Sequence, residues 1–177
     1  MKFSKPGFTV KGTFIDLKTP ERIDLNYINW LWSDPNTMKE IGGPILLEPG
    51  MAAKWYEQMV FPGNGKDLYF LIFTKRGSPV GEVGFHRFDT EKKEAELNIK
   101  ISAKNRGKGY GSEAVKLLLN IFFKEFHGEI ISDPVALKNI NGSKMLISLG
   151  FVQDKSISEH CLLYLSKKRY QLLLLRW

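Results

Sequence analysis

The sequence predicts an α+β fold, in which a mixed, largely antiparallel central sheet of about six to seven strands is flanked by helices on both faces. Three observations lead to this prediction. Residues 68–101 contain three strand-like segments joined by short polar turns. Segments with the period of amphipathic helices lie before and after them. Strands and helices are mixed without strict βαβ alternation, which argues against a purely parallel sheet.

The N-terminal third is expected to hold one strand and two helices. Residues 8–19 (FTVKGTFIDLKT) read as a first strand with mixed alternation. Thr19-Pro20-Glu21 supplies an N-cap with proline at the first helical position, so a helix is expected over 21–32. Residues 33–50 are rich in Gly and Pro and predict a long irregular connection. Residues 51–61 (MAAKWYEQMVF) suit a second helix.

The centre of the chain reads as a meander of three strands over residues 68–74, 79–88 and 94–101. In the third strand, apolar and polar residues alternate, so one face is apolar and the other is polar. The polar face carries Glu96 and Lys100.

The C-terminal part is expected to alternate helices and short strands. Residues 112–126 predict a helix with a narrow polar stripe, which should lie deep against the sheet. A short strand over 129–134 and a helix over 141–150, ending at Gly150, follow. Residues 151–166 resemble two strands and 167–177 a closing helix. Its LLLLRW end belongs either to the core or to the interface of a homodimer.

Length and composition indicate one domain spanning residues 1–177 of an ordinary soluble protein, with 43% hydrophobic and 25% charged residues. A single cysteine, Cys161, excludes an intrachain disulfide, and with three histidines no Cys/His metal site is expected. The sequence shows no secretory h-region and no apolar run of about 20 residues. A cytoplasmic protein without a membrane partner is therefore expected.

A basic, glycine-rich loop is the main functional signal. The net charge of +7 fits either plain solubility or an anionic ligand. Residues 105–111 read NRGKGYG, between a predicted strand and a buried helix. Backbone N–H groups at a helix start attract anions, and glycines let a phosphate come close. The alternative is a tight turn with solvated basic residues. Neither the Walker A nor the dinucleotide-binding pattern is present.

Arg106, Gly109 and Gly111 form R-x-x-G-x-G, which resembles the acyl-CoA signature of the GNAT superfamily of N-acetyltransferases. Four further stretches resemble the branch that contains the ribosomal-protein-alanine N-terminal acetyltransferases. They cover residues 28–44, 81–102, 139–151 and 162–173. The resemblance extends from residue 8 to the C-terminal end and implies a GNAT-like fold.

The resemblance implies acetyl-CoA as co-substrate and a primary amine as acceptor, either a protein N-terminal α-amine or a small-molecule amine. It also implies that a bulge in the strand over 94–101 opens a gap for the acyl group. The residues expected to bind CoA are Arg106, Gly107, Lys108, Gly109, Tyr110, Gly111 and Ser112 for the pyrophosphate, the backbone of Ile99, Lys100 and Ile101 for the pantetheine, and Asn139, or Asn141 in a shifted register.

The catalytic residues are harder to assign. Glu96 is the first candidate general base, and His86 is the second. A symmetric turn between their strands would place His86 opposite Glu96 or one residue away, so that the pair could relay a proton. Glu82, on the same face as His86, is the third. Leu146 occupies the position where many relatives carry a tyrosine acid, and Ser143 is the candidate contact to the thiol.

The alternative function is a CoA-binding or RNA-binding module without catalysis. The positive charge and the missing tyrosine permit it. Tyr110 is the only aromatic residue in the basic window, which disfavours stacking on RNA bases.

Overall fold

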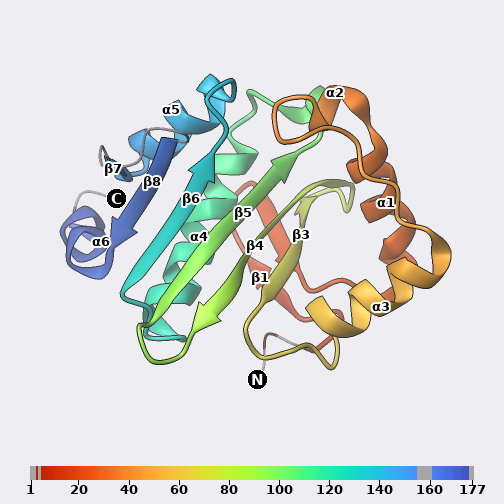
Figure 1. Ribbon diagram of the computed structural model, residues 1–177, viewed down its shortest axis with the longest axis horizontal. Helices are drawn as coiled ribbons and strands as arrows, with labels where there is room; N and C mark the ends of the chain where they lie inside the picture. Colours follow the sequence, from red (N-terminus) through yellow and green to blue (C-terminus); the bar gives the residue numbers. More distant parts are fainter. Residues whose placement is uncertain (1–2, 4, 155–160, 176–177) are drawn as a thin grey trace.

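The computed structural model describes residues 3, 5–154 and 161–175, and within them the chain forms an eight-stranded sheet with helices on both faces (Figure 1). The strands are β1 (Thr9–Lys11), β2 (Ile15–Lys18), β3 (Leu68–Thr74), β4 (Pro79–Asp89), β5 (Glu94–Ile101), β6 (Ile130–Val135), β7 (Val152–Asp154) and β8 (Cys161–Ser166). The helices are α1 (Leu25–Ser33), α2 (Pro35–Met38), α3 (Pro49–Met59), α4 (Tyr110–Lys124), α5 (Ile140–Ser148) and α6 (Lys167–Leu174), with 3-10 turns at Arg22–Asp24 and Ala103–Asn105.

The strand order is β1-β2-β3-β4-β5-β6-β8-β7, and neighbours are antiparallel except for β5 and β6, which are parallel. The expected mixed, largely antiparallel sheet is confirmed. It has more strands than predicted because residues 8–19 form a hairpin rather than one strand. The turn of this hairpin is held by a residue of another element, α4. The Glu113 carboxylate accepts hydrogen bonds from the Thr13 and Phe14 N–H groups.

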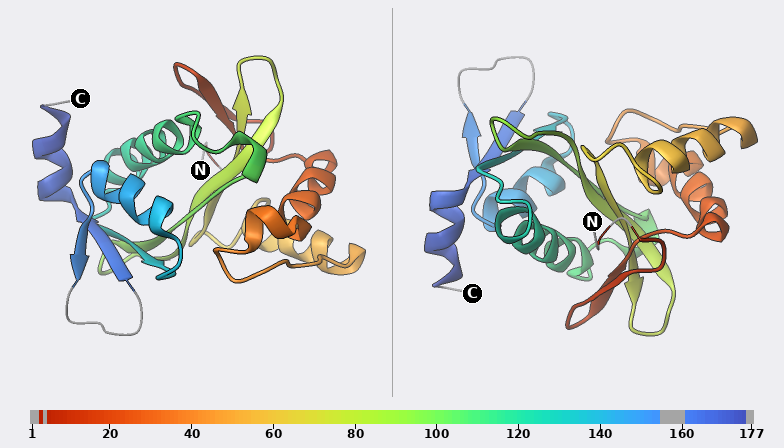
Figure 2. Two further views of the ribbon diagram at one scale, coloured as in Figure 1. Left: turned by 90° about the horizontal axis from the view of Figure 1, so that it is seen from above. Right: turned by 90° about the horizontal axis from the view of Figure 1, so that it is seen from below.

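Two apolar cores lie on opposite faces of the sheet. Figure 2 shows α4 and α5 on one side and α1, α2 and α3 on the other. Successive side chains of β3 point to opposite faces and so contribute to both cores. Phe70 faces the core that includes α4, while Tyr69 and Leu71 face α1 and α3. Among the described residues, no helix is both long and apolar enough to cross a membrane.

The first helix begins later than predicted. Thr19 is not an N-cap, because its hydroxyl donates to the Phe3 carbonyl instead. A 3-10 turn over Arg22–Asp24 precedes α1, which starts at Leu25. The expected irregular connection contains the short helix α2, because the Asp34 carboxylate accepts from the N–H groups of Asn36 and Thr37.

The parallel strands β5 and β6 separate toward their C-terminal ends (Figure 1). They pair where Glu94, Ala95 and Glu96 oppose residues 130–132. The bulge that was expected in β5 lies in β4, where the register shifts between His86 and Asp89. The prediction was wrong, because β5 pairs with β4 without a shift from Glu96 to Ile101, and the extra residue lies on β4, where Arg87 has a φ of 57°.

Candidate active site

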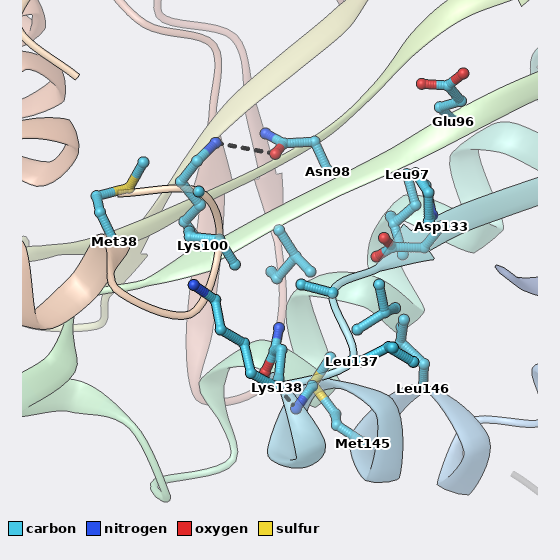
Figure 3. A pocket seen from close by; sticks show the side chains of 18 of the residues that line it. Met38, Glu96, Leu97, Asn98, Lys100, Asp133, Leu137, Lys138, Met145 and Leu146 are labelled. Carbon is cyan, nitrogen blue, oxygen red and sulfur yellow. Dashed lines mark hydrogen bonds between the residues drawn. The ribbon is translucent and has the colours of Figure 1, made fainter. Parts of the chain in front are cut away.

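A cavity of about 780 Å³ fills the space between the separated ends of β5 and β6, and we call it the gap cavity. Its walls come from Glu96–Lys100 of β5, Asp133–Val135 of β6 and the start of α5 (Figure 3). Residues 39–45, which follow α2 and are called the lip, contribute Ile41, Gly42 and Ile45. The cavity therefore lies between strands that would otherwise pair.

A second cavity of about 550 Å³, the loop cavity, lies beside the glycine-rich loop and shares Ile99, Lys100 and Asn139 with the gap cavity. It brings together nearly all residues that the sequence assigned to CoA. They are Ile99, Lys100, Ile101, Arg106, Gly107, Gly109, Tyr110, Gly111, Ser112 and Asn139, with Asn141 beside them. Lys108 does not line it; its ammonium group donates to the Asn105 side chain at 2.9 Å.

The glycines of the loop leave room for an anion. Gly107 and Gly109 have φ angles of 74° and 82°, and a Cβ at either position would meet nothing within 4 Å. Gly109 is also the N-cap of α4, so the first N–H groups of that helix point toward the loop. The residues present thus fit a pyrophosphate, and its binding to this loop stays a prediction.

The edge of β5 that faces the gap can bind an extended ligand. The Ser102 N–H donates to Val80 on β4, so backbone alternation turns the N–H of Ile99 toward the gap. This edge continues past the last pair with β6, between Glu96 and Ser132. A pantetheine arm could pair there in the way a neighbouring strand does.

Asp133 is the functional candidate that sequence reasoning missed. Its carboxylate points into the gap cavity from β6 (Figure 3). Burial and, to a lesser extent, the Glu96 charge raise its pKa from 3.8 to about 7, while Lys100 opposes the shift. The sequence did place Asp133 in a short predicted strand. What it did not predict is that this strand, β6, pairs in parallel with β5 and so brings Asp133 to the site. A carboxylate with this pKa suits a general base near neutral pH.

Glu96 and His86 lie opposite each other in the β4–β5 register, and both line the gap cavity. The Glu96 carboxylate is engaged, however, because Arg87 Nη1 lies 2.8 and 2.9 Å from its two oxygens. His86 Nδ1 lies 3.4 Å from Asp67 Oδ1. Both residues therefore lie at the site, but their contacts do not identify either one as the general base.

Glu82 is fully buried and serves a structural purpose. Its carboxylate accepts hydrogen bonds from Trp32 on α1, from Tyr69 on β3, and from Asn98 and Lys100 on β5. Burial alone would raise its pKa, but the Lys100 ammonium and the other donors outweigh burial and lower it. An ionised, fully hydrogen-bonded carboxylate fixes β5 to β4 and α1, and it is poorly suited to accept a proton.

Helix α5 provides the apolar side of the gap. Met145 and the buried Leu146 line the cavity, whereas Ser143 lines neither cavity. The Asn139 side chain caps α5 by accepting from the Gly142 N–H at 2.9 Å. The described residues contain no group of three or more His, Cys, Asp and Glu side chains that could hold a metal ion.

Comparison with known proteins agrees with this geometry. Residues 15–152 match the family model described as acetyltransferase (GNAT) domain, and the chain belongs to this family. The family consists of enzymes that transfer an acetyl group from acetyl-CoA to an amine, so the chain is an acetyl-CoA-dependent N-acetyltransferase.

The individual relatives are distant. An uncharacterised N-acetyltransferase, p20, from Bacillus licheniformis is 24% identical, over 82% of this chain and 83% of that protein. The structure of spermidine N-acetyltransferase from Vibrio cholerae, solved with CoA and spermine, is similar to this chain with a TM-score of 0.79 at 18% identity. The match covers 90% of this chain and 99% of that protein. A GNAT-family acetyltransferase from Bacillus anthracis has a TM-score of 0.74 at 18% identity, covering 91% and 99%. These structures share the fold.

Replacing Asp133 with asparagine should change how stability depends on pH. Because the folded-state pKa is raised from 3.8 to about 7, the full stability of the wild-type chain is present below the ordinary pKa of Asp133. It falls as the pH rises from 3.8 to about 7 and changes no further above that, because the unfolded chain ionises Asp133 first. The asparagine side chain cannot ionise, so the variant should equal wild type near about pH 4 and exceed it by a few kcal/mol near about pH 8. Urea unfolding across this range measures the difference.

Asp89→Asn is the matched control. Hydrogen bonds from the Lys92 and Glu91 N–H groups lower the pKa of Asp89. Its contribution to stability is present above the ordinary pKa and lost in acid, so this variant should be less stable than wild type at neutral pH. A pH-independent difference for Asp133→Asn would contradict the raised pKa.

Proposed function

We propose that this enzyme acetylates the α-amine of a protein or peptide N-terminus, with Asp133 as the general base. The observation that supports it most is the placement of Asp133, with its pKa of about 7, in the gap between β5 and β6. We further propose that residues 1–177 act as one domain. A cytoplasmic location is proposed because one cysteine permits no intrachain disulfide.

Acetyl-CoA supplies the acetyl group as a thioester. Asp133 takes one proton from the acceptor ammonium, directly or through a water molecule, and leaves a neutral amine. The amine nitrogen then forms a bond to the thioester carbonyl carbon, and the carbon–sulfur bond breaks. A β5 N–H facing the gap, such as that of Ile99, stabilises the negative charge on the carbonyl oxygen. The second proton of the nitrogen passes to the CoA sulfur, and Asp133 releases its proton to solvent.

The pKa of the base favours an α-amine acceptor. An α-ammonium has a pKa of roughly 7.7–8.0, about one unit above Asp133, whereas a lysine-type ammonium lies near 10.4. Proton transfer to Asp133 is therefore much less costly from an α-ammonium. The exposed apolar residues Ile45 and Leu137 line the gap cavity and could contact the rest of a peptide.

A polyamine acceptor is the second candidate. The structural neighbour from V. cholerae is a spermidine N-acetyltransferase. In this chain, however, two acids that could attract a polycation are engaged. Asp34 caps α2, and Glu40 forms an ion pair with Arg106. These contacts reduce the negative charge available to a second ammonium group.

The pH dependence of turnover should identify the base. For a peptide acceptor, wild-type kcat/KM should fall below an apparent pKa of about 7. Asp133→Asn should lower kcat/KM roughly a hundredfold or more near neutral pH and move the acidic limb toward the pKa of the amine itself. Initial-rate measurement of thiol release over the pH range gives both profiles.

Glu96→Gln is the control for this experiment. Because the Glu96 charge raises the pKa of Asp133, this variant should keep the acidic limb and shift it to lower pH. If Glu96→Gln abolishes the limb while Asp133→Asn retains it, Glu96 is the base and the proposal fails.

The acceptor class can be tested with matched substrates. A short peptide with a free N-terminus should be acetylated at least roughly tenfold more efficiently, in kcat/KM, than the same peptide N-formylated with a lysine added. The kcat/KM for spermidine should be similar to that of the N-formylated, lysine-containing peptide. Mass spectrometry of the products locates the acetyl group. Preference for spermidine, or for the lysine side chain, would contradict an α-amine acceptor.

A further inference from the structure

Arg106 opens the R-x-x-G-x-G motif, yet its guanidinium contacts the segment around α2. Nη2 donates to the Thr37 carbonyl at 2.7 Å, and Nη1 lies 3.4 Å from Glu40 Oε2. Nε donates to the Ile101 carbonyl at 3.3 Å, at the end of β5. All three guanidinium nitrogens therefore contact protein groups, and they join β5, the loop and the lip.

Helix α2 needs such support because it is only four residues long. A helix this short is not stable by itself, and its C-terminal carbonyls have no partner within the helix. Arg106 supplies a charged donor to the Thr37 carbonyl. Thr37 is fully buried, and its hydroxyl oxygen also accepts from the Ala103 N–H at 3.0 Å. Two hydrogen bonds from residues 103–106 thus hold α2.

The position of α2 decides the position of the lip. Met38 ends the helix, and it lines the gap cavity together with Ile41. Glu40 and Ile41 also line the loop cavity. The lip is therefore a wall common to the place where CoA is expected and the place where the acceptor must enter.

We propose that Arg106 is a positioning residue that holds the lip over the acyl gap, so that the loop binding CoA and the wall receiving the acceptor move as one unit. The inference rests on the proposed acetyl transfer for its kinetic consequence. It differs from the simple interpretation of the motif, in which a basic side chain serves as a ligand of the pyrophosphate. Glu40 already offsets the Arg106 charge, which weakens its use as a phosphate ligand.

Arg106→Gln tests the proposal by three measurements. The affinity for CoA, by calorimetry, should stay within roughly twofold of wild type with the same dependence on salt, because no phosphate contact is lost. Hydrogen exchange at the Ile41 and Gly43 amides, which donate to the Met38 carbonyl, should be roughly tenfold faster. The KM for a peptide acceptor should rise by roughly tenfold, with a smaller change in kcat.

Lys108→Gln is the matched control, since it removes one positive charge from the same loop without touching α2. It should leave exchange in the lip unchanged. Arg106→Lys, which keeps the charge but not the planar fork, should reproduce the faster exchange if Arg106→Gln folds poorly.

The proposal is overturned if Arg106→Gln weakens CoA binding by roughly tenfold or more, lowers its salt dependence and leaves lip exchange unchanged. Failure of wild type to acetylate any peptide would instead contradict the proposed acceptor. The binding and exchange measurements would still decide the role of Arg106.

Discussion

The site depends on one backbone constraint: β5 and β6 run parallel but pair only along part of their length. Backbone N–H and C=O groups inside a protein require partners, so a strand edge released in this way favours an extended ligand. The other edge of β5 stays fixed, because β4 pairs with it and the buried Glu82–Lys100 ion pair joins the two strands. A rigid strand with one available edge is suited to hold a thioester in place.

The same separation explains the chemistry of Asp133. A fully paired sheet with polar neighbours would leave a carboxylate near its ordinary pKa. Here the side chain enters a cavity walled by apolar residues such as Leu146, so burial makes ionisation costly. In the proposed mechanism, strand separation therefore provides both the space for the acyl group and a base whose pKa suits neutral pH. The buried Glu82 shows the opposite outcome, because its four donors keep it ionised.

Much of this structure could be predicted from the sequence. Strong periodicity located β3, β4, β5 and α4. Local chemistry located the glycine-rich loop, because glycine conformation and helix start depend on neighbouring residues. The other residues around the loop cavity were implied by the family resemblance. The hairpin of β1 and β2 was missed because Glu113, about one hundred residues away, fixes its turn. Asp133 was missed because its environment depends on strand pairing, and the contacts of the Arg106 side chain were missed because they depend on α2. Contacts between distant segments leave little trace in local sequence.

The most direct test of the account is a crystal structure with acetyl-CoA or a non-hydrolysable analogue. The account predicts the pyrophosphate on the loop over residues 106–112, the pantetheine paired with the free edge of β5, and the thioester carbonyl beside Asp133. Pantetheine bound away from the gap between β5 and β6, or a thioester out of reach of Asp133 even through one water molecule, would contradict it.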